Sequence, residues 1–155
     1  MSGDVRHRIL LIRHAKAGVR EDWVGDDRLR PLTKSGLRQA EALVQQLAEE
    51  PIDRVLSSPY VRCVQTVEPL ARARGLRIEE TEALAEGAGI HPFLRLIPGA
   101  GNAAMCTHGD VMHDVIDWLD QRGVHVDGGI AKGSTWVLDV LAGEVLSARY
   151  LPPPA

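Results

Sequence analysis

The stretch Ile9-Leu10-Leu11-Ile12-Arg13-His14 runs from four consecutive apolar residues directly into two side chains that can carry positive charge. A short, continuous apolar run is typical of a strand buried on both faces of a parallel sheet. Ligands of α/β proteins bind at the carboxyl ends of such strands. We therefore expect a first strand over residues 9–12 and, at its end, an anion-binding site containing Arg13 and His14.

Strand and helix patterns alternate along the rest of the chain, which predicts an α/β protein: a three-layer α/β/α sandwich with a mostly parallel central sheet. Thr33 is expected to cap a helix over 34–49, with Leu32 stapled onto Leu37. Ser58-Pro59 is expected to start a second helix, with Ser58 as its N-cap. The remaining expected elements are a helix over 110–121, strands over 53–57, 77–80 and 102–107, and a closing hairpin of 135–140 and 144–150. We expect two long loops, 15–32 and 86–101, at the same edge of the sheet as His14.

Size and composition limit what the chain can be. Its 155 residues, 45% of them hydrophobic, predict one domain spanning residues 1–155 with a packed core. A net charge of −3 without a basic run argues against nucleic-acid binding. No apolar stretch approaches the ~20 residues of a membrane span, and no signal-peptide pattern is present, so we expect a cytoplasmic protein. The oligomeric state stays open.

Metal and cofactor motifs are not apparent in the sequence. Cys63 and Cys106 are isolated and fit no ligand spacing, so two buried, reduced thiols are expected. His108 and His113 lie five positions apart, which differs from the i, i+4 spacing of a helical metal pair. We therefore expect neither a metal site nor a cofactor.

Two further strand ends carry residues that can partner Arg13 and His14. Ser57-Ser58-Pro59 leads into a helix whose first turn contains Arg62, and the strand over 102–107 ends at Thr107-His108-Gly109. Arg guanidinium groups match phosphoryl oxygens with paired hydrogen bonds. Helix N-termini add backbone N–H groups to such a site. The combination predicts a pocket for a phosphoryl group.

Four segments resemble the histidine phosphatase superfamily, whose fold is phosphoglycerate mutase-like. They are Leu-Ile-Arg-His-Ala at 11–15, Arg-Pro-Leu-Thr-Lys-Ser-Gly at 30–36, Ser-Ser-Pro-Tyr-Val-Arg-Cys-Val-Gln-Thr at 57–66 and Thr-His-Gly at 107–109. They occur in the family's order and cover most of the chain. The chain departs from the commoner Arg-His-Gly form of the first motif, because Ala15 stands where glycine is usual.

The resemblance implies catalytic roles for individual residues. His14 would attack phosphorus and carry the phosphoryl group as phosphohistidine, and Arg13, Arg62 and His108 would hold the transferring oxygens. Gly109, beside His108, is expected to contact substrate. Leu84-Ala85-Glu86 resembles the family's Leu-x-Glu, so Glu86 is expected to be the proton donor. The alternatives are Glu82 and no acid at all. The resulting enzyme would be a metal-independent phosphoric monoester hydrolase.

The sequence leaves the substrate open. Only residues 86–101 fill the region where mutases and acid phosphatases carry large insertions, which predicts a minimal cap and an open pocket. That pocket favours a SixA-type phosphohistidine phosphatase acting on a phosphorylated protein.

Loop 15–32 supports a different substrate. It resembles the phosphatase module fused behind Nudix hydrolases in some actinobacterial proteins, which favours nucleotides or other small phosphorylated metabolites. Trp23 in this loop could stack on a base or peptide, or could pack in the core. Arg30 could bind phosphate or anchor the loop. A third hypothesis is a non-catalytic module that binds a phosphorylated ligand.

Overall fold

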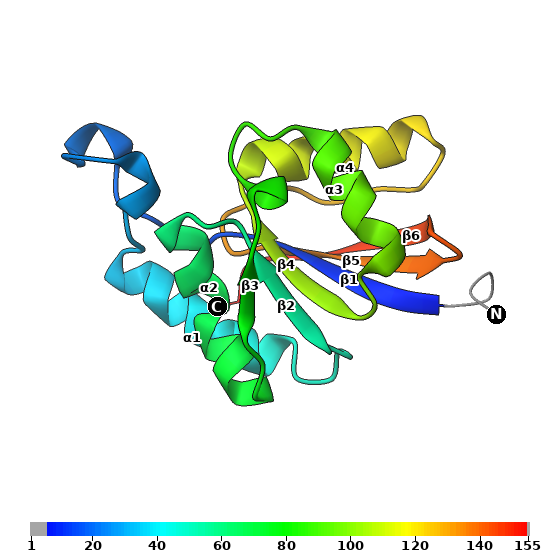
Figure 1. Ribbon diagram of the computed structural model, residues 1–155, viewed down its shortest axis with the longest axis horizontal. Helices are drawn as coiled ribbons and strands as arrows, with labels where there is room; N and C mark the ends of the chain where they lie inside the picture. Colours follow the sequence, from blue (N-terminus) through cyan, green and yellow to red (C-terminus); the bar gives the residue numbers. More distant parts are fainter. Residues whose placement is uncertain (1–5, 155) are drawn as a thin grey trace.

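The computed structural model describes residues 6–154, in which a six-stranded sheet lies between two layers of helices (Figure 1). The strands are β1 (Arg6–Arg13), β2 (Arg54–Ser57), β3 (Ile78–Glu80), β4 (Ala103–Thr107), β5 (Thr135–Leu141) and β6 (Glu144–Leu151). Their order is β3-β2-β4-β1-β5-β6. The first four in this order pair in parallel, and the hairpin β5–β6 is antiparallel. The mostly parallel α/β sandwich is confirmed.

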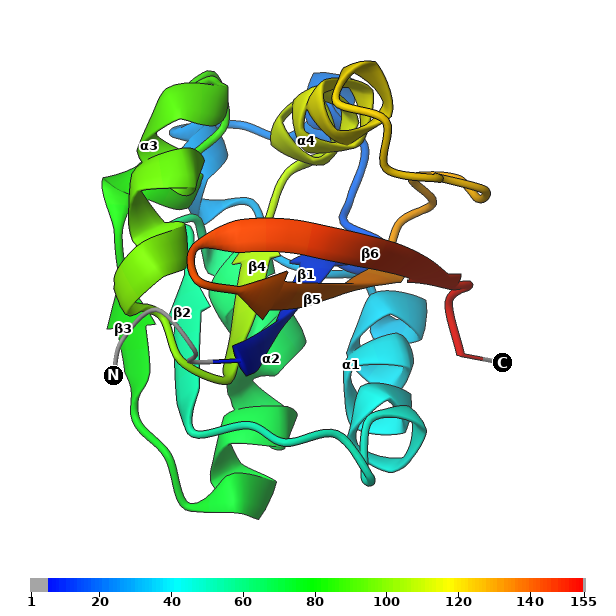
Figure 2. The same cartoon turned by 90° about the vertical axis from the view of Figure 1, so that its right-hand side faces the viewer.

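Helices cover both faces of this sheet (Figure 2). On one face lie α1 (Lys34–Gln46) and α2 (Val61–Arg74), and on the other lie α3 (Ile90–Leu96) and α4 (Gly109–Gln121). The central strands are therefore buried on both sides, and the residues from Ile9 to Ile12 have no exposed surface. Alternate residues point to opposite layers, because Leu10 and Ile12 pack under α1 and α2 while Ile9 and Leu11 face α3 and α4.

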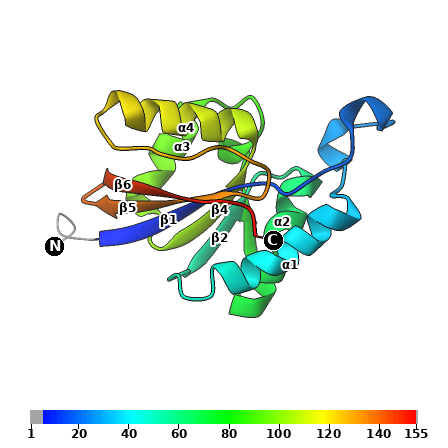
Figure 3. The same ribbon diagram turned by 180° about the vertical axis from the view of Figure 1, so that it is seen from behind.

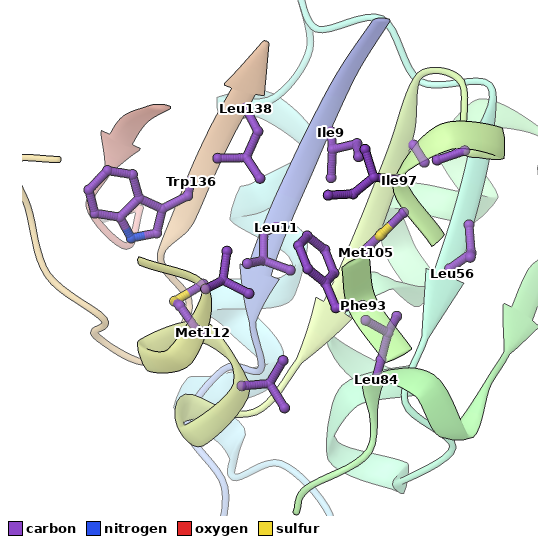
Figure 4. Close-up of a cluster of buried hydrophobic side chains, with 14 of the residues drawn as sticks. Ile9, Leu11, Leu56, Leu84, Phe93, Ile97, Met105, Met112, Trp136 and Leu138 are labelled. Atoms are coloured by element: carbon purple, nitrogen blue, oxygen red, sulfur yellow. The ribbon is translucent and has the colours of Figure 1, made fainter. Parts of the chain in front are cut away.

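The core beneath α3 and α4 is closed by large side chains from distant parts of the chain (Figure 4). Phe93 and Ile97 from the α3 region pack over Ile9 and Met105, and Trp136 closes the side nearer β5. The segment 86–101 was predicted to be a loop, and this prediction is wrong over Ile90–Gly99, which forms α3 and one turn of 3-10 helix. Burial of Phe93 and Ile97 stabilises a helix that the local glycines and prolines do not indicate.

Two predictions of local structure need correction. α2 begins at Val61 with Tyr60 at its N-cap, so Ser58 is not the N-cap and Pro59 is not the first helical residue. Thr33 caps α1 as predicted, since its hydroxyl accepts a hydrogen bond from the Gly36 N–H at 3.0 Å. Leu37, which was expected to staple onto the buried Leu32, is 44% exposed.

The segment between β1 and α1 projects beyond the carboxyl edge of the sheet (Figure 3, blue). It contains two short 3-10 turns, Arg20–Asp22 and Asp27–Leu29, and its ends are tied by a bridge between Ala17 and Leu32. Exposed apolar side chains are concentrated here, among them Val19 and Val24. The projection forms one side of the site described next.

Candidate active site

The register of the parallel strands brings the predicted site residues together. Arg13 pairs with Thr107 across β1 and β4, and Ser57 pairs with Cys106 across β2 and β4. The residues that follow, His14, His108 and Ser58, therefore leave the sheet at the same edge. The His14 and His108 rings lie 5.4 Å apart between centroids in an edge-to-face arrangement.

His14 is held in one orientation and is nearly inaccessible to solvent. Its Nδ1 lies 2.8 Å from the Ala15 carbonyl oxygen, which can only accept, so Nδ1 carries the ring hydrogen. In the neutral ring, Nε2 is left with a free lone pair. The pKa of His14 is lowered from 6.5 to about 3, with burial as the largest cause; the neighbouring His108, Arg62 and Arg13 add to this lowering, and the hydrogen bond to the Ala15 carbonyl oxygen opposes it. His14 is thus neutral at physiological pH, with Nε2 unprotonated.

His108 lies at the N-cap of α4 and is 2% exposed. Its Nε2 is 2.8 Å from Ser58 Oγ, and the same hydroxyl accepts from the Tyr60 N–H at 3.2 Å. Ser58 is therefore free to donate its own hydrogen to Nε2, which leaves the ring hydrogen of a neutral His108 on Nδ1. The sequence pointed to Ser58 as a helix cap, whereas its hydroxyl orients this imidazole.

Arg62, in the first turn of α2, is fully buried and ion-paired. Its Nη2 contacts Asp27 Oδ2 at 3.0 Å and Glu86 Oε1 at 2.9 Å, and its Nη1 donates to the Asp27 carbonyl oxygen at 2.8 Å. Its guanidinium also lies 4.8 Å from the centre of the Tyr60 ring. Asp27 was not predicted, although it pairs with Arg62, Arg30 and Arg20.

Glu86 lies at the site, as expected for a residue predicted to act there. Its carboxylate pairs with Arg62 and with Arg20, and Oε1 is 3.5 Å from His108 Nδ1. Hydrogen bonds to the backbone on both sides of Glu86 fix its position: the Thr107 hydroxyl donates to the Leu84 carbonyl oxygen at 2.7 Å, and the Gly87 N–H donates to Asp110 Oδ2 at 2.8 Å. Glu82, the alternative acid, is paired with Arg28 on the surface and does not line the cavity at His14.

Arg13 is half-buried at the mouth of the site, and its position explains Gly109. The Nη1 of Arg13 donates to the Ile130 carbonyl oxygen at 2.7 Å. A Cβ built on Gly109 would lie 2.6 Å from Arg13 Cζ, closer than any side chain can tolerate. Glycine at 109 is thus what allows the guanidinium to lie flat against the start of α4. Burial lowers the pKa of Arg13, against the opposing charge of Asp110.

Three buried nitrogens at this edge have no hydrogen-bond partner among residues 6–154: Arg13 Nε, Arg62 Nε and His108 Nδ1. Buried donors are almost always paired, so a cluster of unpaired donors beside one nucleophilic nitrogen indicates a site for an acceptor-rich ligand. Guanidinium and imidazole groups favour a ligand that is an oxyanion. The predicted grouping of Arg13, His14, Arg62 and His108 is therefore present in the structure.

A cavity of about 770 Å³ opens above His14 and is lined by Arg13, His108, Gly109 and Glu86. Arg30 also lines it, and its guanidinium bonds to Asp27 and to the Gly18 carbonyl oxygen, so the residue anchors the projecting segment as well as facing the cavity.

Trp23 lies outside this cavity and lines a neighbouring one, which Arg30 shares. Trp23 is 36% exposed, and its indole N–H donates to the Asp26 carbonyl oxygen. The expectation that Trp23 packs in the core is therefore wrong.

The motif over 57–66 contributes positioning contacts that sequence reasoning did not find. Thr66 Oγ1 accepts from the Ala15 N–H at 2.9 Å and donates to the Arg62 carbonyl oxygen at 2.7 Å. Gln65 Oε1 accepts from the Leu32 N–H at 2.8 Å. One turn of α2 thus holds the backbone after His14 and the end of the projecting segment.

Over residues 6–154, no three His, Cys, Asp or Glu side chains are placed to hold a metal ion together. In the same part of the chain, no helix has both the length and the apolar character required to cross a membrane.

Fold and site together define an α/β protein with a buried, neutral histidine facing a cradle of guanidinium and imidazole donors at the carboxyl edge of its sheet. The chain belongs to the histidine phosphatase superfamily (branch 1), whose family model matches residues 9–91. Those residues contain Arg13, His14, Arg62 and Glu86, while His108 lies beyond the matched range.

Individual relatives agree with this membership. Over 155 aligned residues, the chain is 41% identical to an 8-oxo-(d)GTP phosphatase from Mycolicibacterium smegmatis, covering 94% of this chain and 48% of the relative. The chain therefore spans about half the length of that protein. A structure from Agrobacterium tumefaciens, provisionally assigned as the phosphohistidine phosphatase SixA, is 25% identical with a TM-score of 0.78, covering 94% and 98% of the two chains. The protein histidine phosphatase SixA complexed with tungstate shares the fold at 17% identity and TM-score 0.70, covering 96% of each.

Proposed function

We propose that the chain is a phosphatase that transfers a phosphoryl group from its substrate to His14 and then to water. One observation carries the proposal: the neutral His14 ring, with Nε2 unprotonated, lies 5.4 Å from the His108 ring at the edge of the sheet where three buried N–H donors, on Arg13, Arg62 and His108, have no hydrogen-bond partner among residues 6–154. A nucleophile next to unsatisfied donors suits an in-line displacement in which negative charge is spread over the transferring oxygens.

The proposed roles follow from the position of each side chain. Nε2 of His14 attacks phosphorus, and Nδ1 keeps its hydrogen bond to the Ala15 carbonyl oxygen, which stabilises the charge that develops on the ring. Arg13, Arg62 and His108 donate to the three phosphoryl oxygens. Gly109 permits the contact of Arg13 with the site. The positive charge comes from side chains, so the proposal assigns no step to a metal ion.

Glu86 is proposed as the acid that serves poor leaving groups. Its carboxylate is ion-paired with Arg62 and Arg20, and it must take up a proton before it can donate one. Phosphoryl oxygens compete with Glu86 for Arg62, and a carboxyl displaced from Arg62 lies close to His108 and the cavity. A leaving group that departs as a stable anion has little need of this proton.

A nucleotide or a similar small phosphorylated metabolite is the better supported substrate. The 8-oxo-(d)GTP phosphatase is 41% identical to this chain over 94% of its length. The cavity above His14 is of the size that binds small molecules. Trp23 and Arg30 line an adjoining cavity, where a base could stack on the indole while Arg30 faces both spaces.

A phosphohistidine-bearing protein is the second candidate. The segment over the site is short, with α3 as its single helix of seven residues, and the likeness to the Agrobacterium tumefaciens structure covers nearly both chains. An open site of this kind accommodates a side chain presented on a protein surface. A phosphoramidate also leaves without strong acid assistance, consistent with an ion-paired Glu86.

Trapping of the covalent intermediate tests the proposal directly. Wild-type chain mixed with a reactive aryl phosphate and quenched in alkali should retain one acid-labile phosphoryl group, and His14→Ala should retain none. Exposed His125 supplies the matched control, since His125→Ala should label like wild type. Absence of labelling and of turnover with aryl phosphate, nucleotide and phosphohistidine protein alike would leave the chain a non-catalytic phospho-ligand module. Comparison of kcat/KM for the nucleotide with kcat/KM for the phosphohistidine protein distinguishes the two candidate substrates.

A further inference from the structure

Lys132 lines the cavity above His14, although no predicted role involves it. It precedes Gly133, whose N–H donates to the carbonyl oxygens of both Arg13 and His14 at 3.1 Å. This pair of backbone contacts fixes the Lys132 backbone directly beside the proposed nucleophile. Burial lowers the pKa of Lys132, and so do the neighbouring charges of Arg13, Arg30, Lys16 and Arg62, in that order.

Lys16, two residues after His14 in the chain, lines the same cavity. Its N–H donates to Gln39 Oε1 at 3.0 Å, and its carbonyl oxygen accepts from the Thr33 N–H at 3.0 Å. A Cβ on Gly36 would lie 2.0 Å from that carbonyl oxygen, so only glycine lets α1 approach this closely. The backbone of Lys16 is thus as firmly placed as that of Lys132.

The two lysines differ from Arg20 and Arg30 in making no ion pair. Arg20 and Arg30, in the same cavity, are neutralised by Glu86 and Asp27. Within residues 6–154, neither Lys16 nor Lys132 lies within ion-pair distance of a carboxylate, although Glu21, Asp110 and Asp114 also line the cavity. Both lysine side chains are exposed at the cavity wall, where their ammonium groups and Arg13 repel one another, and a bound anion relieves that repulsion. In the proposed mechanism the transferred phosphoryl group is bound by Arg13, Arg62 and His108. The two lysines are therefore available to bind a second anion.

We propose that Lys16 and Lys132 form a subsite for a second phosphate next to the one transferred to His14. The substrate class is then a phosphoanhydride, such as a nucleoside diphosphate, cleaved at its terminal phosphorus. This inference rests on the proposed phosphatase function and narrows it from phosphorylated metabolites to those with two adjacent phosphates.

The chemistry balances with the groups present. The Nε2 lone pair of His14 bonds to the terminal phosphorus while the bond from that phosphorus to the bridging oxygen breaks. The bonding electrons remain on the bridging oxygen, which departs as part of a monophosphate anion stabilised by the two ammonium groups. Water then attacks the phosphohistidine, the P–N bond breaks, its electrons return to Nε2, and inorganic phosphate and a proton are released. No proton is required by the first leaving group, consistent with an ion-paired Glu86.

The test compares three substrates: guanosine 5′-diphosphate, guanosine 5′-monophosphate and an aryl phosphate, the last two carrying a single phosphate. Wild type should show a kcat/KM for the diphosphate at least about tenfold above that for the monophosphate. In the Lys16→Gln/Lys132→Gln variant, the ratio of diphosphate to aryl phosphate kcat/KM should fall by about tenfold or more, the loss expected for one charge-assisted hydrogen bond. The Lys16→Arg/Lys132→Arg variant, which keeps both positive charges, should retain much of the wild-type ratio. Exposed Lys34, the only other lysine, gives the control Lys34→Gln, which should keep the wild-type ratio.

The outcomes separate this inference from the proposed function. Equal use of diphosphate and monophosphate by wild type, or an equal loss on diphosphate and aryl phosphate in the double glutamine variant, overturns the subsite while phosphatase activity stands. Absence of turnover and of phosphoenzyme with all three substrates overturns the proposed function itself. A thermal melt of each variant excludes loss of fold as the cause.

Discussion

Replacement of His14 by glutamine should make the protein less sensitive to acid. The folded state holds the pKa of His14 at about 3, against 6.5 for a free imidazole, chiefly because the ring is buried among cationic groups. Between these values the unfolded chain binds a proton that the folded chain refuses, so wild-type stability is full above about pH 6.5 and falls as the pH is lowered towards 3. Each pH unit between 6.5 and 3 lowers the free energy of unfolding by about 1.4 kcal/mol, so the titration of His14 alone lowers it by about 2 kcal/mol between pH 8 and pH 5.

Urea unfolding in phosphate-free buffer at the two pH values measures this effect. The fall in unfolding free energy should be smaller in His14→Gln than in wild type by about 2 kcal/mol, whatever the absolute stability of the variant. His125→Gln, which removes an exposed histidine, should follow wild type. If the pH dependence of His14→Gln and wild type agrees to within about 0.5 kcal/mol, the ring is not held neutral by its surroundings, and the argument for a nucleophile ready at physiological pH fails.

Three further predictions concern the cradle of donors. Arg62→Ala should lower kcat/KM by about 10²–10³-fold, as removal of an oxyanion donor does. The melting temperature should change much less, because Asp27 and Glu86 keep their ion pairs with Arg30 and Arg20. A large loss of melting temperature that accompanies the loss of kcat/KM would contradict this prediction. Gly109→Ala should displace the Arg13 guanidinium and reduce kcat/KM by about 10²-fold with the fold intact, which circular dichroism and steady-state rates check together. Activity should persist in excess EDTA, since guanidinium and imidazole groups supply the positive charge, and loss of most activity on chelation would refute that.

The sheet and the core of the site could be predicted because both depend on local patterns. Apolar runs mark β1 and β4, and the carboxyl ends of parallel strands meet at one edge, so Arg13-His14 and His108 had to come together. α3 could not be predicted, because Gly87, Gly89 and two prolines indicate a loop while only the tertiary burial of Phe93 makes the helix stable.

The partners of the arginines were beyond sequence reasoning for a related reason. Asp27 reaches Arg62 only because the segment after β1 projects from the sheet and turns back, and no periodicity reports that path. Ser58 has the residue type and position of a helix cap, yet its hydroxyl is taken by His108 across β2 and β4. Contacts between segments 35 to 50 residues apart follow from the assembled fold.

The two carboxylates that pair with Arg62, those of Asp27 and Glu86, are held differently, and this difference affects which of them a substrate can displace. Asp27 holds the guanidinium through its side chain and its backbone carbonyl, and is itself tied to Arg30, whereas Glu86 contributes one carboxylate oxygen to Arg62 and lines the cavity. We therefore propose that a doubly charged phosphoryl group competing for Arg62 displaces Glu86 and leaves Asp27 in place. The displaced carboxyl stays near His108, because Gly87 is fixed by Asp110. On this proposal Arg62 stays aligned by Asp27 throughout, and Glu86 is released to act as the acid only when substrate is bound.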